Sequence, residues 1–473
     1  MAQSIKFGTD GWRAVIADDF TYENLTKVAL ATARYFAKHR KIKNGVVIGY
    51  DARFMSKEFA EKSAEVMANA GVKIKLADSI VSTPMISLVT KLDNAAGGIV
   101  ITASHNPARY NGFKVKGDFG GPAHPEMIAQ VEKELAKVMK LNRLPAAALT
   151  LGQLLAKGKV AHISMKARYL DDLAGKIDLT LIKRSGLRIL YDVMYGAGQQ
   201  VLDETLPDVK QIHEFYNPSF GGTNPEPLAQ NLGELMRRVK EEKYDLGIAT
   251  DGDADRIGAV DEKGNFVDSH RIFSLLLKYL VEQKKMSGAV VKSFTVTQMV
   301  DQQCAKYGLT MIETPVGFKY ICREMTRGDV LIGGEESGGL GVKGHLPERD
   351  GIFLGLMLCE MVAVRRKPLS ALVQELMDEF GQHEFRRVDL HLTEKEKTAI
   401  MKKYKKGVRE IAGYAVTGRK DTDGYKFFVD KGWLLVRASG TEPLIRLYAE
   451  ADSVEKVDAL LAASVPGAGI AKR

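Results

Sequence analysis

The segment Gly97-Gly98-Ile99-Val100-Ile101-Thr102-Ala103-Ser104-His105-Asn106-Pro107 is the clearest guide to how this chain folds. Its apolar first half predicts a short buried β-strand. The strand ends at a hydroxyl, an imidazole and an amide, and Pro107 prevents further regular strand pairing. In open α/β sheets, ligands bind beyond the carboxyl ends of the strands. The alternative is a turn that only caps the next element. The other loops of the chain distinguish this turn from a ligand-binding loop.

The residues before this segment alternate between helix and strand patterns. We expect helices over 22–38 and 57–70, strands over 46–50 and 72–76, and a short helix that opens at Thr83-Pro84. This alternation is typical of a parallel sheet covered on both faces. It returns twice, with closing strands at 246–250 and 330–332, and in the second pass a helix is expected between strands 187–191 and 211–215.

Each of the three closing strands runs into an unusual polar loop. We therefore infer three related α/β units that deliver one loop each to a central cleft. From about residue 384 the sequence pattern changes. Apolar and polar residues alternate in Val388-Asp389-Leu390-His391-Leu392, which predicts a strand with one solvent-exposed face. The predicted fold class is α/β: three related α/β units with mixed, mostly parallel sheets, and a smaller C-terminal α+β domain. We place the domains at 1–150, 151–262, 263–380 and 381–473.

Composition narrows the class of protein. The chain has 473 residues, 45% hydrophobic and 27% charged, which is ordinary for a globular protein of about three or four domains. Its three cysteines give no disulfide framework or metal spacing, and the first residues contain no apolar core of a signal peptide. No stretch is long and apolar enough to cross a bilayer. We therefore expect a cytoplasmic protein without a membrane partner.

The net charge of +9 bears on the ligand. Basic runs occur at 38–41, 365–367 and 402–406, and such runs are typical of solvated helix faces. A nucleic-acid partner is not expected, because only Tyr404 places an aromatic ring within such a run. A small anionic substrate such as a phosphorylated metabolite fits this charge.

Three aspartates follow the strand 246–250. Asp251, Asp253 and Asp255 are spaced i, i+2 and i+4, so extended geometry turns their side chains to one side. Three such carboxylates are unfavourable together unless a hard cation joins them, and Mg²⁺ fits well. An EF-hand is the rival interpretation, since Glu262 occupies loop position 12. Position 6, however, is Arg256 where an EF-hand needs glycine, and the flanks read as strands.

Two further loops carry polar groups. Gly334-Glu335-Glu336-Ser337-Gly338-Gly339 is not a nucleophile elbow, since Glu335 precedes Ser337 by two residues where glycine is required. It suits sugar hydroxyls, or alternatively a helix N-cap. Arg437-Ala438-Ser439-Gly440-Thr441-Glu442-Pro443, with Arg446 behind it, can form an anion-binding nest. No Walker A or dinucleotide fingerprint follows a predicted strand.

These four loops, in this order, resemble those of the α-D-phosphohexomutase family, and the resemblance spans nearly the whole chain. It implies that Ser104 carries a phosphoryl group and, with Asp251, Asp253 and Asp255, holds one Mg²⁺. Glu335 and Ser337 would grip the sugar hydroxyls. The resemblance also implies a phosphate clamp of Arg437, Ser439, Gly440, Thr441 and Arg446, a reacting end lined by Arg13, His105, Lys114 and Arg256, and further contacts from Lys319 and His345.

The implied activity interconverts hexose 1-phosphate and hexose 6-phosphate through a phosphoserine and a hexose 1,6-bisphosphate, with glucose 1,6-bisphosphate as activator. Glu335-Glu336 is similar to the loop of glucose-specific mutases, whereas Gly338-Gly339 departs from the glycine-histidine of mannose/glucose and glucosamine relatives. Glucose phosphates are thus expected first, with mannose or glucosamine phosphates as alternatives. A glucose 1,6-bisphosphate synthase would carry the same loops. A sugar-phosphate-binding protein without turnover is the remaining alternative.

Overall fold

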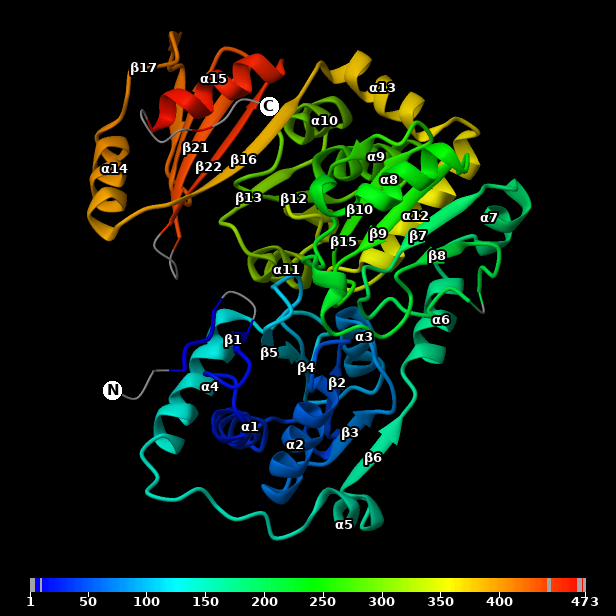
Figure 1. The fold of residues 1–473 in the computed structure, drawn as a ribbon, viewed down its shortest axis with the longest axis vertical. Helices are drawn as coiled ribbons and strands as arrows, with labels where there is room; N and C mark the ends of the chain where they lie inside the picture. The colour runs from blue at the N-terminus through cyan, green and yellow to red at the C-terminus, as the bar shows by residue number, and fades with distance from the viewer. Residues whose placement is uncertain (1–4, 9–10, 204, 440–443, 466–469, 471–473) are drawn as a thin grey trace.

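Four main sheets organise the computed structural model, which describes residues 5–8, 11–203, 205–439, 444–465 and 470 (Figure 1). The first sheet has the order β1-β5-β4-β2-β3-β6. Its strands are β1 (Trp12–Val15), β2 (Val46–Tyr50), β3 (Ile74–Ala77), β4 (Gly97–Ile101), β5 (Tyr110–Gly117) and β6 (Val160–Ile163). Its helices are α1 (Tyr22–Phe36), α2 (Ser56–Asn69), α3 (Thr83–Leu92), α4 (Pro125–Val138) and α5 (Leu151–Ala156).

The second sheet has the order β11-β10-β9-β7-β8. It is built from β7 (Ile189–Asp192), β8 (Lys210–Ile212), β9 (Leu246–Thr250), β10 (Ile257–Asp261) and β11 (Phe266–Val267), with α6 (Lys166–Ala174), α7 (Leu179–Ser185) and α8 (Gly233–Glu241). The third sheet, β13-β12-β14-β15, contains β12 (Ala289–Ser293), β13 (Met311–Thr314), β14 (Val330–Gly334) and β15 (Leu340–Val342). Its helices are α9 (Ser269–Glu282), α10 (Met299–Tyr307), α11 (Phe318–Arg327), α12 (Gly351–Arg365) and α13 (Leu369–Phe380).

One four-strand arrangement recurs in these three sheets. The orders β3-β2-β4-β5, β8-β7-β9-β10 and β13-β12-β14-β15 each consist of three parallel strands followed by one antiparallel strand. The polar loop always joins the third parallel strand to its antiparallel neighbour, at the edge where ligands bind in such sheets. The predicted set of three related α/β units with mixed sheets is confirmed.

The fourth sheet is antiparallel, with the order β16-β22-β21-β20-β19. Its strands are β16 (Glu384–His391), β19 (Gly418–Lys420), β20 (Tyr425–Val429), β21 (Gly432–Ala438) and β22 (Leu444–Ala451). Helices α14 (Glu394–Lys406) and α15 (Val454–Ser464) and the small hairpin β17 (Glu410–Ile411) and β18 (Tyr414–Ala415) complete it. The predicted C-terminal α+β domain is therefore present.

Two local features differ from the sequence expectation. Strand β6 pairs in parallel with β3, so the first sheet takes up a strand from beyond residue 150. The helix expected between β7 and β8 is absent from the described residues of that connection, which lack residue 204. Met194, Tyr195 and Gln200 have positive φ there (49°, 55° and 56°), which breaks helical geometry.

A continuous apolar cluster runs through the first three units, while the fourth has its own core. Helix α12 is buried from Gly351 to Ala363 and contacts β9, β10 and α9. A small cluster joins the fourth domain to the third: Phe294 packs with Trp433, Leu435 and Tyr448, and Lys426 Nζ donates to the Phe294 carbonyl at 2.9 Å. In the described part of the chain, no helix has the length and apolarity needed to span a membrane.

Candidate active site

Ser104 lies at the carboxyl end of β4, fully buried, with a φ of 54°. This left-handed conformation is uncommon for a residue other than glycine and indicates a loop held by its surroundings. The Ser104 N–H donates to Thr102 Oγ1 at 2.8 Å, and its hydroxyl donates to Asp251 Oδ2 at 2.8 Å. The Ser104 hydroxyl thus connects the polar loop after β4 to the polar loop after β9.

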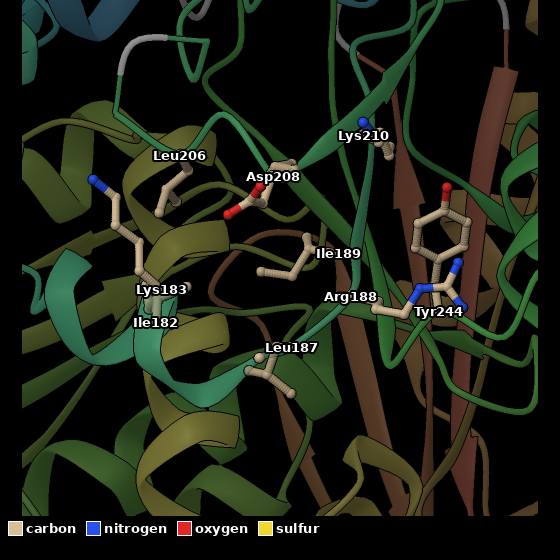
Figure 2. A pocket seen from close by; sticks show the side chains of 11 residues that line it. Ile182, Lys183, Leu187, Arg188, Ile189, Leu206, Asp208, Lys210 and Tyr244 are labelled. Carbon is tan, nitrogen blue, oxygen red and sulfur yellow. The ribbon is translucent and has the colours of Figure 1, made fainter.

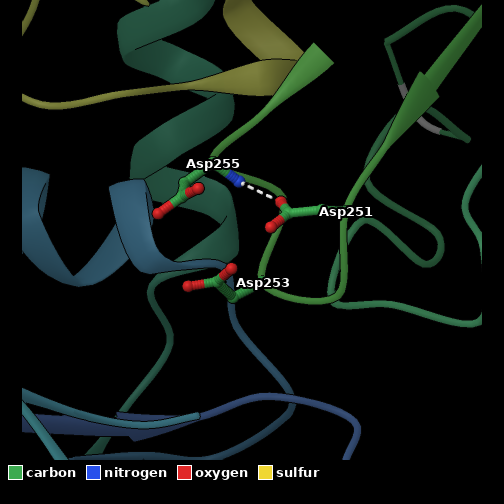
Figure 3. Close-up of side chains that lie close together, drawn as sticks. All are labelled: Asp251, Asp253 and Asp255. Carbon is green, nitrogen blue, oxygen red and sulfur yellow. Dashed lines mark hydrogen bonds between the residues drawn. The ribbon is translucent and has the colours of Figure 1, made fainter. Parts of the chain in front are cut away.

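Asp251, Asp253 and Asp255 are fully buried and converge, with one oxygen of each within 4.8 Å of the others (Figure 3). Asp251 Oδ1 accepts the backbone N–H groups of Asp255 and Arg256 at 2.9 and 3.1 Å, which fixes the turn. Burial, and then the charges of Asp253 and Asp255, raise the pKa of Asp251 well above its ordinary value. The cluster is therefore electrostatically unfavourable without a cation.

The unused oxygens of this triad fit a metal ion. Oδ1 of Asp253 and Oδ1 of Asp255 are buried and have no hydrogen-bond partner among the described residues. Buried carboxylate oxygens without a partner are costly, and a hard divalent ion such as Mg²⁺ takes ligands of this kind. Asp251, Asp253, Asp255 and the Ser104 hydroxyl are the groups that could hold it.

Cationic side chains surround the triad. Lys114, on β5, is fully buried, with Nζ 2.8 Å from Asp253 Oδ2 and 3.3 Å from Asp255 Oδ2. Burial raises the pKa of Asp253, but Lys114, the Thr83 hydroxyl and the charge of Arg349 together lower it by more, so the pKa lies below its ordinary value. Arg256 donates to Glu226 at 3.0 Å, with its Nε 4.0 Å from Asp251. Such a site favours a dianionic phosphoryl group.

His105 and Arg13 complete the reacting end. His105 Nδ1 lies 3.4 Å from the Ser104 hydroxyl. Burial, and then the charges of Arg256 and Arg13, hold the pKa of His105 well below its ordinary value, so the ring is neutral at neutral pH and can accept a proton. Arg13 on β1 donates to Asn106 Oδ1 at 2.7 Å. The structure brings together Arg13, Ser104, His105, Lys114 and Arg256.

Glu335 belongs to the third loop and is buried. Its Oε1 accepts the Gly317 N–H at 2.9 Å, just before Lys319 at the start of α11. Burial raises the pKa of Glu335 to about 7, and the charge of Arg349 opposes this rise. Ser337 is half-buried in the turn that Gly338 closes with a φ of 88°. The Gly338 carbonyl accepts the Ile257 N–H at 3.0 Å, so this loop contacts the second unit.

The fourth domain presents arginines on one sheet face. Arg437 and Arg446 are register partners on β21 and β22, and Asp389 on β16 is opposite Arg446. Arg437 Nε lies 2.9 Å from Asp423, and Arg446 Nε lies 3.5 Å from Asp389. Burial lowers the pKa of Arg437, but Asp423, Tyr448 and the charge of Glu336 together raise it by more. The charge of Glu336 in the third loop is thus felt at Arg437. Ser439 is buried at the end of β21, while Gly440 and Thr441 lie outside the described residues.

His345 is not placed with these groups. Its ring is buried, with Nε2 2.8 Å from Asp350 Oδ2, Nδ1 3.0 Å from Lys176 Nζ and 3.5 Å from Asp172 Oδ2. Phe353 stacks on the other side, with ring centroids 4.1 Å apart. These contacts tie α6 to the start of α12, so the expected substrate contact by His345 finds no support in its surroundings.

Two surface cavities also lie apart from the candidate residues. One of about 270 Å³ lies in the second unit, lined by α7 and the starts of β7 and β8 (Figure 2), and another of about 320 Å³ lies near the ends of β2 and β3 in the first. Ile189 and Leu206 of the first cavity are apolar, and none of the residues named for the chemistry lines either cavity. The candidate active site is therefore identified from the geometry of the polar loops and not from either cavity.

The structure adds two arginines that the sequence did not single out. Arg53 follows β2 and binds the carbonyls around Ser104. Arg349 lies 2.7 Å from Asp255 Oδ2 and 3.7 Å from Glu335 Oε2. Asp51-Ala52-Arg53 directly follows the predicted strand 46–50, so its position at a strand end could have indicated Arg53. Arg349 belongs to no sequence motif or periodic pattern that would have indicated it.

Four Phosphoglucomutase/phosphomannomutase domain families match in order: alpha/beta/alpha domain I over residues 4–142, domain II over 167–264, domain III over 268–380 and the C-terminal domain over 390–465.

Individual proteins match over almost the whole chain. A "Phosphoglucomutase/phosphomannomutase" of Thermococcus kodakarensis is 31% identical, with 95% of each chain covered. A "Phosphoglucosamine mutase" of Carboxydothermus hydrogenoformans is 32% identical, with 94% of each covered. The crystal structure of a Thermus thermophilus protein, provisionally assigned as a phosphomannomutase, is 34% identical, covers 98% of this chain and 99% of its own, and superimposes with a TM-score of 0.85.

Proposed function

Since the chain belongs to the phosphoglucomutase/phosphomannomutase family and is thus an intramolecular phosphotransferase, we propose that it interconverts a hexose 1-phosphate and a hexose 6-phosphate through phosphorylated Ser104. The observation that carries the proposal is the buried Ser104 hydroxyl, 2.8 Å from Asp251 in a triad with unpartnered oxygens. A hydroxyl in this place can carry a phosphoryl group among cations and beside a metal site.

The reaction would consist of two transfers. In the first, the bond between phosphorus and the Ser104 oxygen breaks while a sugar hydroxyl forms a new bond to phosphorus and gives up its proton. The released Ser104 oxygen takes up a proton, which yields a hexose 1,6-bisphosphate and the free Ser104 hydroxyl. In the second, the Ser104 oxygen loses its proton and forms a bond to the other phosphorus, while the bond between that phosphorus and the sugar oxygen breaks and the sugar oxygen takes up a proton. Neutral His105, 3.4 Å from the Ser104 hydroxyl, is placed to accept the proton that Ser104 loses.

Charge stabilisation would come from fixed groups. Lys114 and Arg256 already lie against the triad and would face the transferred phosphoryl group. When bound, Mg²⁺ would neutralise charge on that group. Because phosphoryl transfer needs positioning and charge neutralisation above all, this arrangement suits it.

Sugar recognition would fall to the third and fourth loops. Glu335 and Ser337, with help from Lys319, would bind sugar hydroxyls, and Arg437, Ser439, Gly440, Thr441 and Arg446 would bind the phosphate that does not react. The bisphosphate has to turn over between the two transfers, so this phosphate clamp must accept either end of the sugar. Glucose 1,6-bisphosphate would act as activator because it phosphorylates Ser104.

We propose glucose phosphates as the first substrates to test, on the ground of the Glu335-Glu336 pair. Glu336 accepts a hydrogen bond from Thr295 at 2.5 Å, so Glu335 is the carboxylate left for the sugar. Glucosamine phosphate is the second candidate, since the Carboxydothermus relative is named for it, and mannose phosphate is the third, from the Thermococcus relative.

The test is product analysis by phosphorus NMR. The protein, with Mg²⁺ and a trace of the matching 1,6-bisphosphate, is given the 1-phosphates of glucose, glucosamine and mannose in separate reactions. Conversion of glucose 1-phosphate at the highest kcat/KM supports the proposal, and a preference for another sugar replaces glucose by that sugar. Net accumulation of glucose 1,6-bisphosphate from a phosphoryl donor, without isomerisation, would instead identify a synthase.

A further inference from the structure

Arg53 is a buried arginine outside the residues assigned to chemistry, with 1% of its surface exposed. It follows β2 and points beneath the Ser104 loop. Its Nη2 donates to the carbonyls of Ser104 and Asn106, the latter at 2.7 Å. Its Nη1 donates to the carbonyls of Pro107 and Tyr110 at 3.0 and 3.1 Å. One guanidinium therefore binds four carbonyls of a single loop.

The remaining nitrogen of this guanidinium, Nε, is buried and lies 3.3 Å from Asp51 Oδ2 in an ion pair, without a hydrogen bond among the described residues. Of the five N–H donors of an arginine, the four on Nη1 and Nη2 bind carbonyls and the fifth is buried beside Asp51, so none is presented to a phosphate. Phe220 of the second unit covers the guanidinium, with its ring centroid 4.9 Å away. Arg53 is thus placed to act on the loop and not on the substrate.

Asp51 extends the same network to the Ser104 backbone. Its Oδ2 accepts the Thr102 hydroxyl at 2.5 Å, and Thr102 Oγ1 in turn accepts the Ser104 N–H at 2.8 Å. The Ser104 peptide is therefore held at its N–H through Thr102 and at its carbonyl by Arg53. A residue kept at a φ of 54° requires such constraints.

The opposite side of the Ser104 carbonyl is closed by the metal loop. A Cβ added to Gly252 would lie 2.4 Å from that carbonyl oxygen, so the two backbones are in direct contact. The Gly252 N–H donates to the Pro225 carbonyl at 3.1 Å, which fixes the metal loop in turn. A shift of the Ser104 carbonyl would therefore move Ser104 relative to Asp251.

We propose that Arg53 is a positioning residue for phosphoryl transfer: by binding the carbonyls of Ser104, Asn106, Pro107 and Tyr110, it holds the Ser104 oxygen in line with the metal triad. This rests on the proposed role of Ser104. Misplacement of a reacting atom by about 1 Å can lower a rate about 100-fold. Loss of the guanidinium should then lower kcat and leave the KM for the sugar phosphate unchanged.

The test compares Arg53→Lys with wild type and with Arg168→Lys, whose arginine pairs with Asp93 at 2.6 Å outside the loop. A lysine has three donors, so it loses at least two of the contacts of Arg53. For Arg53→Lys we expect a fall in kcat of about 100-fold, a KM within about threefold of wild type, and an equally slowed transfer of phosphorus from ³²P-labelled glucose 1,6-bisphosphate to Ser104. Arg168→Lys should match wild type.

Two results would overturn the proposal. In one, folded Arg53→Lys retains kcat within threefold of wild type. In the other, its KM rises while kcat holds, which would make Arg53 a binding residue. Should Arg53→Lys fail to fold, Thr102→Val removes the link to the Ser104 N–H with little change of shape. It should lower kcat roughly tenfold at unchanged KM, and an unchanged kcat would count against the network.

Amide hydrogen exchange over residues 103–110 separates this inference from the proposed function. Exchange there should accelerate in Arg53→Lys without any substrate, whether or not the protein is a mutase. If wild type takes no label on Ser104 but the variant loop exchanges faster, the serine chemistry fails and the loop contact stands. If wild type is labelled and the variant equals it in exchange and rate, the Arg53 inference alone fails.

Discussion

Arg349 Nη2 lies 2.7 Å from Asp255 Oδ2, and Arg349 Nη1 lies 3.7 Å from Glu335 Oε2. One buried guanidinium therefore joins a carboxylate of the metal triad to the carboxylate offered to the sugar. A Cβ added to Gly339 would lie 2.2 Å from Arg349 Cδ, so the third loop needs glycine there to let Arg349 pass. This gives Gly338-Gly339 a structural reason that is independent of sugar choice.

Arg349→Met should destabilise the protein, because removing one partner of a buried charge pair leaves the other uncompensated. We expect the free energy of unfolding to fall by about 3 kcal/mol, measured by urea denaturation. The matched control is Arg323→Met, whose arginine pairs with the exposed Glu126 and should cost less than about 1 kcal/mol. Equal losses in the two variants would contradict the bridging role of Arg349.

Ser104→Ala should lower mutase turnover at least ~1,000-fold, since no phosphoryl group can then be carried. Phosphorus NMR of product formation measures this, with circular dichroism to confirm folding. Ser274→Ala is the control for loss of a buried hydroxyl, since Ser274 is buried on α9 without a hydrogen-bond partner in the described chain. Near-normal turnover in Ser104→Ala would remove Ser104 from the mechanism.

Asp253→Asn and Asp255→Asn should each weaken Mg²⁺ binding at least about tenfold, because each removes ligand charge from the triad. Titration calorimetry with Mg²⁺ is the measurement, and chelation of the metal should stop turnover until Mg²⁺ is returned. Asp261→Asn is the control, since this buried aspartate accepts backbone N–H groups of Lys263 and Asn265 in the next turn. Mg²⁺ affinity that is unaltered in the triad variants would argue against the metal site.

Glu335 should make stability depend on pH. Its pKa is raised to about 7 in the folded protein from an ordinary value of 4.5, so between these values the folded state binds the extra proton. The free energy of unfolding should therefore fall as pH rises from about 4.5 to about 7, by up to about 3 kcal/mol. Glu335→Gln should lack this component in urea denaturation at pH 5 and pH 8. Parallel pH profiles of variant and wild type would show that Glu335 titrates normally.

The arginines of the fourth domain should contribute to binding of the sugar phosphate. Arg387, Arg437 and Arg446 lie on the same sheet face, and Arg387 makes a two-point ion pair with Asp389 at 2.7 and 2.6 Å. Replacement of each by glutamine should raise KM about tenfold in steady-state kinetics, since hydrogen bonds to a charged phosphate are lost. Arg386→Gln is the matched control, because Arg386 pairs with Asp458 on the opposite face. If Arg386→Gln raised KM as much, the effect would be structural.

The sequence by itself determined the repeated units and their loops. An apolar strand followed by polar residues is a local pattern, and it correctly marked Ser104, Asp251 and Glu335 as loop residues at strand ends. The three loops have the same position in their sheets because the strand order repeats. In each sheet the loop joins the carboxyl end of the third parallel strand to the antiparallel strand beside it.

Only the tertiary structure decided which distant groups meet. Arg53 reaches carbonyls more than 50 positions along the chain, Arg349 reaches Asp255 from another unit, and His345 turns to Asp350 and Asp172. Strand β6 joins the first sheet from beyond the expected boundary in the same way. These contacts depend on how whole units pack together. A buried arginine and a solvated one look alike in sequence, since burial and charge pairing arise only when segments far apart in the chain are brought into contact.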